Sequence, residues 1–159
     1  MIQRPQTVLL LFIILLMAAA LFLPNWQKSS PDGAIHIVQT AFEMQVNSAT
    51  PGQETKIISR WYIGVGMILV AALAGFSISQ YKKRMNQLKI GFGLTLSVTL
   101  CLVAIMLGGK EGEAFTEPAR HGEYGYGFYL LFISLFLNMI SNRLIRRDEH
   151  LVRSMDRIR

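Results

Sequence analysis

Glutamate and histidine side chains gather in the segment "GGKEGEAFTEPARHGE" (residues 108–123). Glu117, His121 and Glu123 carry oxygen and nitrogen atoms of the kind that bind cations. Their spacing matches no dedicated metal-binding loop, and no helix or strand pattern holds them in place. A solvated acidic loop is therefore the preferred interpretation, and we predict no metal ion and no cofactor.

No catalytic motif is present in the sequence. It lacks a nucleophile elbow, a P-loop, a zinc-binding spacing and a glycine-rich dinucleotide turn. The single cysteine, Cys101, lies within an apolar run, where a thiol resists ionisation, so we expect a packing residue. One hypothesis is an enzyme that uses the carboxylates of Glu113, Glu117 and Glu123. It ranks third, after the two given at the end of this subsection, and we expect no enzymatic activity.

Long apolar runs make up a large part of the chain, so they determine where its polar side chains lie. Hydrophobic residues make up 52% of the 159 residues and charged residues 16%, against about 25% charged in soluble domains. The runs cover residues 7–23, 61–79, 90–107 and 124–140, and none contains Asp, Glu, Lys, Arg or His. A membrane-spanning segment needs about 20 apolar residues and must be helical in lipid. We therefore predict an all-α membrane protein, a four-transmembrane-helix bundle that forms one membrane domain over residues 1–159.

Charge on the connecting segments predicts the orientation of these helices. With four crossings, the segments on one side are rich in Lys and Arg, whereas acidic residues outnumber basic ones on the other side. The basic side holds the first residues, the connection around residues 82–89 and the segment after residue 140. Because cytoplasmic loops carry excess Lys and Arg, we predict a multi-pass protein of the bacterial inner (plasma) membrane with both termini in the cytoplasm.

The N-terminal segment has a second interpretation. Residues 1–20 also resemble a signal peptide, with a positive start, an apolar centre and the pair Ala18 and Ala20. Cleavage there would leave three spans in the same orientation. A retained span is favoured because the new N-terminus would begin with the apolar sequence "LFLP".

The first outer segment, residues 24–60, has the pattern of a small extracellular β element. "PDG" (31–33) is typical of a turn. Alternation in "AIHIVQTAFEMQV" predicts two short strands with a change of register near Gln39–Ala41, and "KIIS" (56–59) predicts a third. The alternatives are an irregular loop and, for Phe42–Val46, a short helix.

Polar and small residues within the spans predict helix packing. No ionisable residue and no proline interrupts the spans, which argues against a transporter. Ser134 and Asn138 are four positions apart, share one helix face and could hydrogen-bond across helices. Ala71 and Gly75 form a small-xxx-small pair that permits close approach of two backbones.

The cytoplasmic tail, residues 141–159, ends in "RRDEHLVRSMDRIR" (146–159), and residues 144–159 predict an amphipathic helix that continues the fourth span. Lipid headgroups are one candidate for what it contacts, and a partner protein or a second copy of the chain is the other. Nucleic acid is disfavoured because no aromatic residue is interleaved with the arginines. The predicted interaction residues of this tail are Leu144, Leu151, Met155, Ile158, Arg147 and Arg153.

The two ends of the chain, Met1–Gln6 and Arg147–Arg159, resemble a family of small four-span inner-membrane proteins of Bacteroidetes that is known only as a domain of unknown function (4293). The resemblance covers essentially the whole chain. It implies a membrane location and this architecture, and it carries no established activity, cofactor or catalytic residue.

These observations together predict a non-enzymatic accessory or scaffold subunit of a membrane complex. Its expected partners are the lipid bilayer and either another membrane protein or a second copy of the chain. The alternative is a small transporter or channel component that acts as an oligomer.

Overall fold

The computed structural model describes residues 5–31, 33–48, 55–81, 83–115 and 121–156, with the side chains of residues 84 and 150–156 left out. Within these residues, four helices and five strands follow one another. They are α1 (Pro5–Ala20), β1 (Trp26–Ser29), β2 (Ile35–Gln39), β3 (Glu43–Ser48), β4 (Lys56–Ser59), α2 (Trp61–Ser79), α3 (Arg84–Glu113), β5 (Glu123–Tyr124) and α4 (Tyr126–Asp156).

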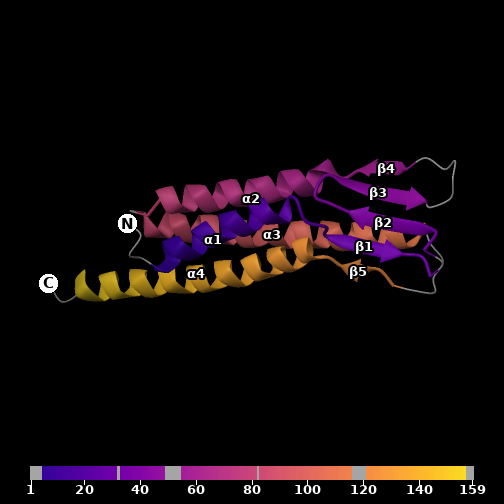
Figure 1. The fold of residues 1–159 in the computed structure, drawn as a ribbon. Coiled ribbons are helices and arrows are strands. Elements are labelled where there is room, and N and C mark those ends of the chain that lie inside the picture. The colour runs from indigo at the N-terminus through magenta and orange to yellow at the C-terminus, as the bar shows by residue number, and fades with distance from the viewer. Residues whose placement is uncertain (1–4, 32, 49–54, 82, 116–120, 157–159) are drawn as a thin grey trace.

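The helices lie side by side, and the strands form a sheet at one end of them (Figure 1). α1 and α3 run toward the sheet, and α2 and α4 run away from it. α1 packs against α2 and α4, and α3 packs against the same two helices. The end next to the strands is called the sheet end, and the opposite end, where α1 begins and α4 ends, is called the remote end.

The helices are apolar on their outward as well as their inward faces. Leu10, Ile13 and Met17 of α1 are buried at helical spacing, whereas Leu69 of α2 and Leu100 of α3 are exposed on the outside. Apolar residues on every side of a helix are typical of one that lipid or protein surrounds. Among the described residues, three segments are long and apolar enough to cross a membrane by length and composition: α2, Met85–Glu113 of α3 and Tyr126–Glu149 of α4.

The predicted all-α class with four spans is therefore wrong in two respects. A five-stranded antiparallel sheet belongs to the fold, and α1, with 16 residues, is shorter than the three candidate spans. α1 ends where the last residues of its apolar run form a turn, in which Phe22 N–H donates to Ala19 O at 3.2 Å. Pro24 follows this turn and disfavours helix at the residue before it.

The sheet has the strand order β4-β3-β2-β1-β5, and all its neighbouring strands are antiparallel. Trp26 pairs with Gln39, and Gln39 pairs with Met44. The two strands predicted within residues 34–46 are confirmed as β2 and β3, and the one predicted at 56–59 is β4. The predicted change of register near Gln39–Ala41 is the hairpin between β2 and β3. The predicted turn is present as well, with Gly33 at a φ of +66°. β1 and β5 were not predicted.

One face of the sheet packs on the last turns of α3. Trp26, Ile37 and Met44 are buried on this face. α3 has 30 residues and is therefore about 45 Å long, which exceeds the roughly 30 Å of a hydrocarbon layer. Its C-terminal part runs beside β1 and β2 (Figure 1). A single continuous helix thus joins the helical region to the sheet.

Candidate functional site at the junction of sheet and helices

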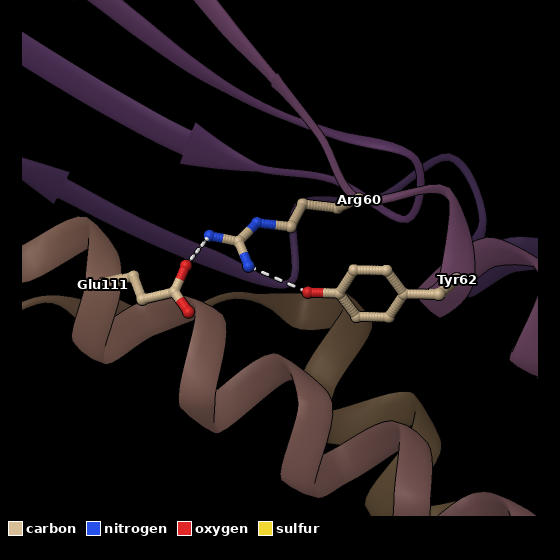
Figure 2. A network of polar contacts seen from close by, with 3 residues as sticks. All are labelled: Arg60, Tyr62 and Glu111. Carbon is tan, nitrogen blue, oxygen red and sulfur yellow. Dashed lines mark hydrogen bonds and ion pairs between the residues drawn. The ribbon is translucent and has the colours of Figure 1, made fainter.

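Arg60 lies where the chain leaves β4 and enters α2, and it is 6% exposed. Its backbone N–H donates to Phe42 O at 2.6 Å, which holds it against the β2–β3 hairpin. Figure 2 shows its guanidinium between two other elements. Nη1 donates to Tyr62 Oη of α2 at 2.8 Å, and Nη2 forms an ion pair with Glu111 Oε2 of α3. One side chain therefore ties the sheet edge, α2 and α3 together.

The two charges of this ion pair are in different environments. The Arg60 side chain is 8% exposed, whereas the Glu111 side chain is 64% exposed. Burial alone would lower the pKa of Arg60, but the hydrogen bonds to Tyr62 and Glu111 outweigh it, so the pKa lies above its ordinary value. The guanidinium is thus charged at every physiological pH and is held by its partners.

Two buried carboxamides lie in the same junction. Asn25 and Gln39 are completely buried, and Asn25 N–H donates to Gln39 O at 2.7 Å, which extends the pairing of β1 with β2 by one residue. The side-chain N and O atoms of both residues lack a hydrogen-bonding partner, as does Nε of Arg60. The junction therefore has unused hydrogen-bonding capacity in a buried position.

Trp26 anchors the sheet to α3 through glycines. A Cβ atom on Gly112 would lie 2.6 Å from the Trp26 ring, and one on Gly109 would lie 3.0 Å from its Nε1. A Cβ atom on Gly122, which precedes β5, would overlap the same indole. Only residues without a side chain admit the ring at these three positions, so the glycines set the distance between sheet and helix.

The chemistry of the junction is that of hydrogen bonding and charge pairing. It contains a guanidinium, a phenol, a carboxylate and carboxamides, and the guanidinium already neutralises the carboxylate. In the part of the chain that the structure describes, no group of three His, Cys, Asp or Glu side chains is placed to bind a metal ion. The arrangement can hold elements together or accept a polar group, and it offers no paired acid and base.

A polar pocket of about 250 Å³ lies at the β1–β5 side of the sheet. Its lining residues are Gln27, Lys28, Ser29, His36, His121 and Glu123. Two members of the suggested cation trio, His121 and Glu123, thus lie at one pocket, whereas Glu117 falls outside the described residues. His121 Nδ1 lies 3.5 Å from Glu113 Oε1, and Glu113 is a residue that the trio did not include.

Of the two polar residues predicted to pack helices, Asn138 forms hydrogen bonds between helices and Ser134 forms one within its own helix. Asn138 Nδ2 donates to Gly91 O at 2.9 Å and to Thr95 Oγ1 at 2.8 Å, which links α4 to α3. The buried Ser134 donates to Leu131 O in its own helix and not across helices. Gly75 faces α1, where a Cβ atom would meet Ile14 Cδ1 at 3.9 Å, and Ala71 is partly buried against the core.

The C-terminal tail is helical as far as Asp156, because α4 continues through it without a break. Leu144 is half-buried, Arg147 is exposed, and Ile145 between them is buried in the core. Leu151, Arg153 and Met155 lie on α4, with side chains outside the described part of the structure. Ile158 also lies outside it. The first turn of the tail is thus part of the packed helical region.

Sequence reasoning missed the junction residues. Arg60, Asn25 and Gln39 all belong to the first outer segment, residues 24–60, and the sequence pattern predicts no site for their side chains. Arg60 could have been found from its position, because it directly precedes a span and follows a predicted strand. An arginine there lies next to both the sheet and the end of the helix. Nothing in the sequence marked Asn25 or Gln39, because their burial depends on strand pairing.

In the part of the chain that the structure describes, three long apolar helices and an antiparallel sheet at one end of them are consistent with one class: a helical membrane protein with a sheet fixed to its helices. Residues 2–158 match the family described as Domain of unknown function (DUF4293), so the chain belongs to this family. The resemblance inferred from the two ends of the sequence is thereby confirmed at the level of the family. A comparison with curated proteins finds no match.

Proposed function

We propose that this protein is a non-enzymatic accessory or scaffold subunit of a membrane complex. The observation that carries the proposal is the double attachment of the sheet to the helices. Arg60 ties one side of the sheet to α2 and α3, and Trp26 is seated on the glycines of α3. A sheet held at two places is a fixed platform, and a fixed platform suits binding because little conformational freedom is lost when a partner docks.

The platform presents a polar face to its surroundings. Gln27, Ser29 and His36 are exposed on the face of β1 and β2 that points away from α3. Interfaces of non-obligate complexes have about the same polarity as the rest of a protein surface, so this face suits a reversible partner. The partner is another membrane protein or a second copy of the chain, and the outward apolar faces of the helices contact the bilayer.

We place the protein in the bacterial inner membrane, with the remote end in the cytoplasm. Exposed basic residues at the remote end support this orientation: Lys83, Lys89, Arg143, Arg146 and Arg147. Acidic side chains gather at the sheet end, among them Glu43, Glu111, Glu113 and Glu123. The positive-inside rule relates such an asymmetry to orientation, and it puts both termini on the cytoplasmic side.

A small transporter or channel component that acts as an oligomer is the second candidate. Buried polar side chains at the remote end favour it, since Gln87 of α3 and Ser141 of α4 are completely buried between apolar helices. The absence of a charged residue among them weighs against coupled ion transport, because proton and ion relays in membranes use ionisable side chains.

A pull-down in mild detergent, with a tag after Arg159 and with cross-linking before lysis, tests the scaffold proposal. We expect a partner in stoichiometric amount, which mass spectrometry identifies. The double variant Ser29→Glu/His36→Glu should release a partner that binds the sheet, whereas Lys83→Glu at the remote end serves as the control. Recovery of the protein alone would contradict the proposal and favour the oligomeric transporter, for which flux into proteoliposomes is the direct assay. The same spectra report whether residues 1–20 are retained.

A further inference from the structure

The buried stripe of each helix becomes polar toward the remote end, and in α4 one buried apolar residue, Ile145, follows the polar ones. In α1, Gln6 precedes Leu10 on the stripe, and in α2, Ser77 follows Ala74. The stripe of α3 begins with the buried Gln87, ahead of Leu94. In α4 the buried residues at this end include Asn138, Ser141 and Asn142. All six side chains are at most 9% exposed.

Packing brings these side chains into one region. Ser77 and Gln87 lie on either side of the short connection between α2 and α3, so they are at a similar depth. Asn142 lies against Gly91, one helical turn from Gln87, because a Cβ atom on Gly91 would overlap its side chain. Gln6 is in the first turn of α1, which packs against both α2 and α4.

Most of the polar atoms in this region lack a partner in the protein. The amide N and O atoms of Gln6 and Gln87, the hydroxyls of Ser77 and Ser141 and the amide oxygens of Asn138 and Asn142 are buried without a hydrogen bond. Burying a polar atom without a hydrogen bond costs free energy in a protein interior. The cost is larger between helices in lipid, where no bulk solvent reaches the atom. Groups from all four helices are affected, so a single misplaced side chain does not account for the pattern.

We infer that the remote end of the helices encloses a hydrated chamber, in which water molecules satisfy these side chains. Water fits because the six side chains are uncharged and offer both donors and acceptors, and a buried water makes two to four hydrogen bonds. Water is preferred to an ion because none of the six carries a charge that would offset the cost of desolvating an ion. The chamber ends toward the sheet, where the interior is formed by apolar residues such as Val70, Val98 and Leu131.

The chamber is therefore one-sided: solvent enters from the remote end and stops at the apolar core. This inference does not depend on the scaffold proposal or on the orientation of the protein in the membrane. The chamber is a polar interior, and a helix bundle that only binds partners at its surface would not need one.

Thiol accessibility in lipid nanodiscs tests the chamber, because both membrane faces are then open to reagent. In a Cys101→Ala background, single cysteines are placed at Ser77, in the chamber, and at Val70, in the apolar core of the same helix. Lys83→Cys, on the exposed connection, is the positive control. A membrane-impermeant thiosulfonate should modify the cysteine at 77 about tenfold faster than that at 70, or more, because a thiolate forms only where water reaches the sulfur. Equal, slow modification at 70 and 77 would overturn the inference.

A second measurement takes its readout from the unaltered protein and uses variants only to assign the signals. Water-edited solid-state NMR in lipid reports magnetisation transfer from water to side-chain amides, and Gln6→Leu and Gln87→Leu assign the two signals. We expect the Gln6 and Gln87 amides to receive water magnetisation as fast as loop amides do. Transfer as slow as that to the buried Val70 and Val98 methyl groups would mean a dry interior and would overturn the inference.

Discussion

Arg60 and Glu111 are separated by 51 positions in the chain, yet their ion pair joins the start of α2 to the end of α3 at the edge of the sheet. The two partners contribute unequally to the stability of the junction. Glu111 is largely solvated, so its loss removes a screened charge, whereas Arg60 is buried and also bonds Tyr62. The asymmetry gives a direct test of which partner holds the junction.

Arg60→Lys should destabilise the protein more than Glu111→Gln. A lysine keeps the charge but lacks the planar fork that reaches Tyr62 and Glu111 together, so we expect a cost of about 1–2 kcal/mol. Glu111→Gln should cost less than about 1 kcal/mol, because an exposed charge is screened. Thermal unfolding in detergent at low and high salt measures both. A larger loss for Glu111→Gln would show that the carboxylate, and not the guanidinium, holds the junction.

Gly112→Ala should loosen the sheet from α3. The added Cβ would lie 2.6 Å from the Trp26 ring, so the indole must move. Gly93→Ala on the same helix is the matched control, because nothing lies within 4 Å of its Cβ. We expect Gly93→Ala to stabilise α3 by up to about 1 kcal/mol through helix propensity and Gly112→Ala to destabilise by about 1–3 kcal/mol through overpacking.

The fluorescence of Trp26 reports the same change, provided that Trp61 is replaced by Phe. A red shift in Gly112→Ala, absent in Gly93→Ala, would mean that the indole has become more exposed to solvent. Identical spectra and identical stability of the two variants would contradict the packing of the Trp26 ring against Gly112.

Gly91→Ala should force α3 and α4 apart, because its Cβ would overlap Asn142. The double variant Gly91→Ala/Asn142→Ala removes the overlapping atoms, so it should recover much of the lost stability. A coupling free energy of about 0.5–3 kcal/mol is the range for residues in contact. Additive effects of the two substitutions would show that the residues do not touch.

The tail should lose its function when its apolar stripe is charged. Leu151→Glu/Met155→Glu places two carboxylates on the stripe, so we expect loss of membrane or partner engagement by the tail, read by co-purification and by growth. His150→Glu/Ser154→Glu adds the same charge away from the stripe and is the control. If the stripe variant leaves both co-purification and growth unchanged, the tail does not dock.

The helices and three strands could be predicted because their signals are local. Charge-free runs locate α2 and α4, and alternation around Ile35 and Ile37 locates β2. β1 escaped prediction because "WQKS" has no apolar alternation and places Lys28 at a buried position. β5 has only two residues, and it pairs with Trp26 and Gln27, which are far away in the sequence.

The polar residues of the interior were the hardest to anticipate. Gln6, Ser77 and Gln87 lie near the ends of apolar runs, where polar residues ordinarily meet water or headgroups. Their burial arises because four helix ends pack together, and no property of a single helix reports it. The C-terminal turns of α3 were missed for the related reason that "KEGE" reads as loop, although the sheet covers one side of it.

The continuation of α3 along the sheet affects how the protein fits bilayers of different thickness. A thicker bilayer would bring acyl chains to Lys110 and Glu111, and a helix bundle ordinarily adjusts to such a mismatch by changing its tilt. Here the sheet is seated on the same helix through Trp26, so it must tilt together with the helices. If the helices cross a bilayer, the angle of the sheet to the bilayer would thus depend on lipid composition.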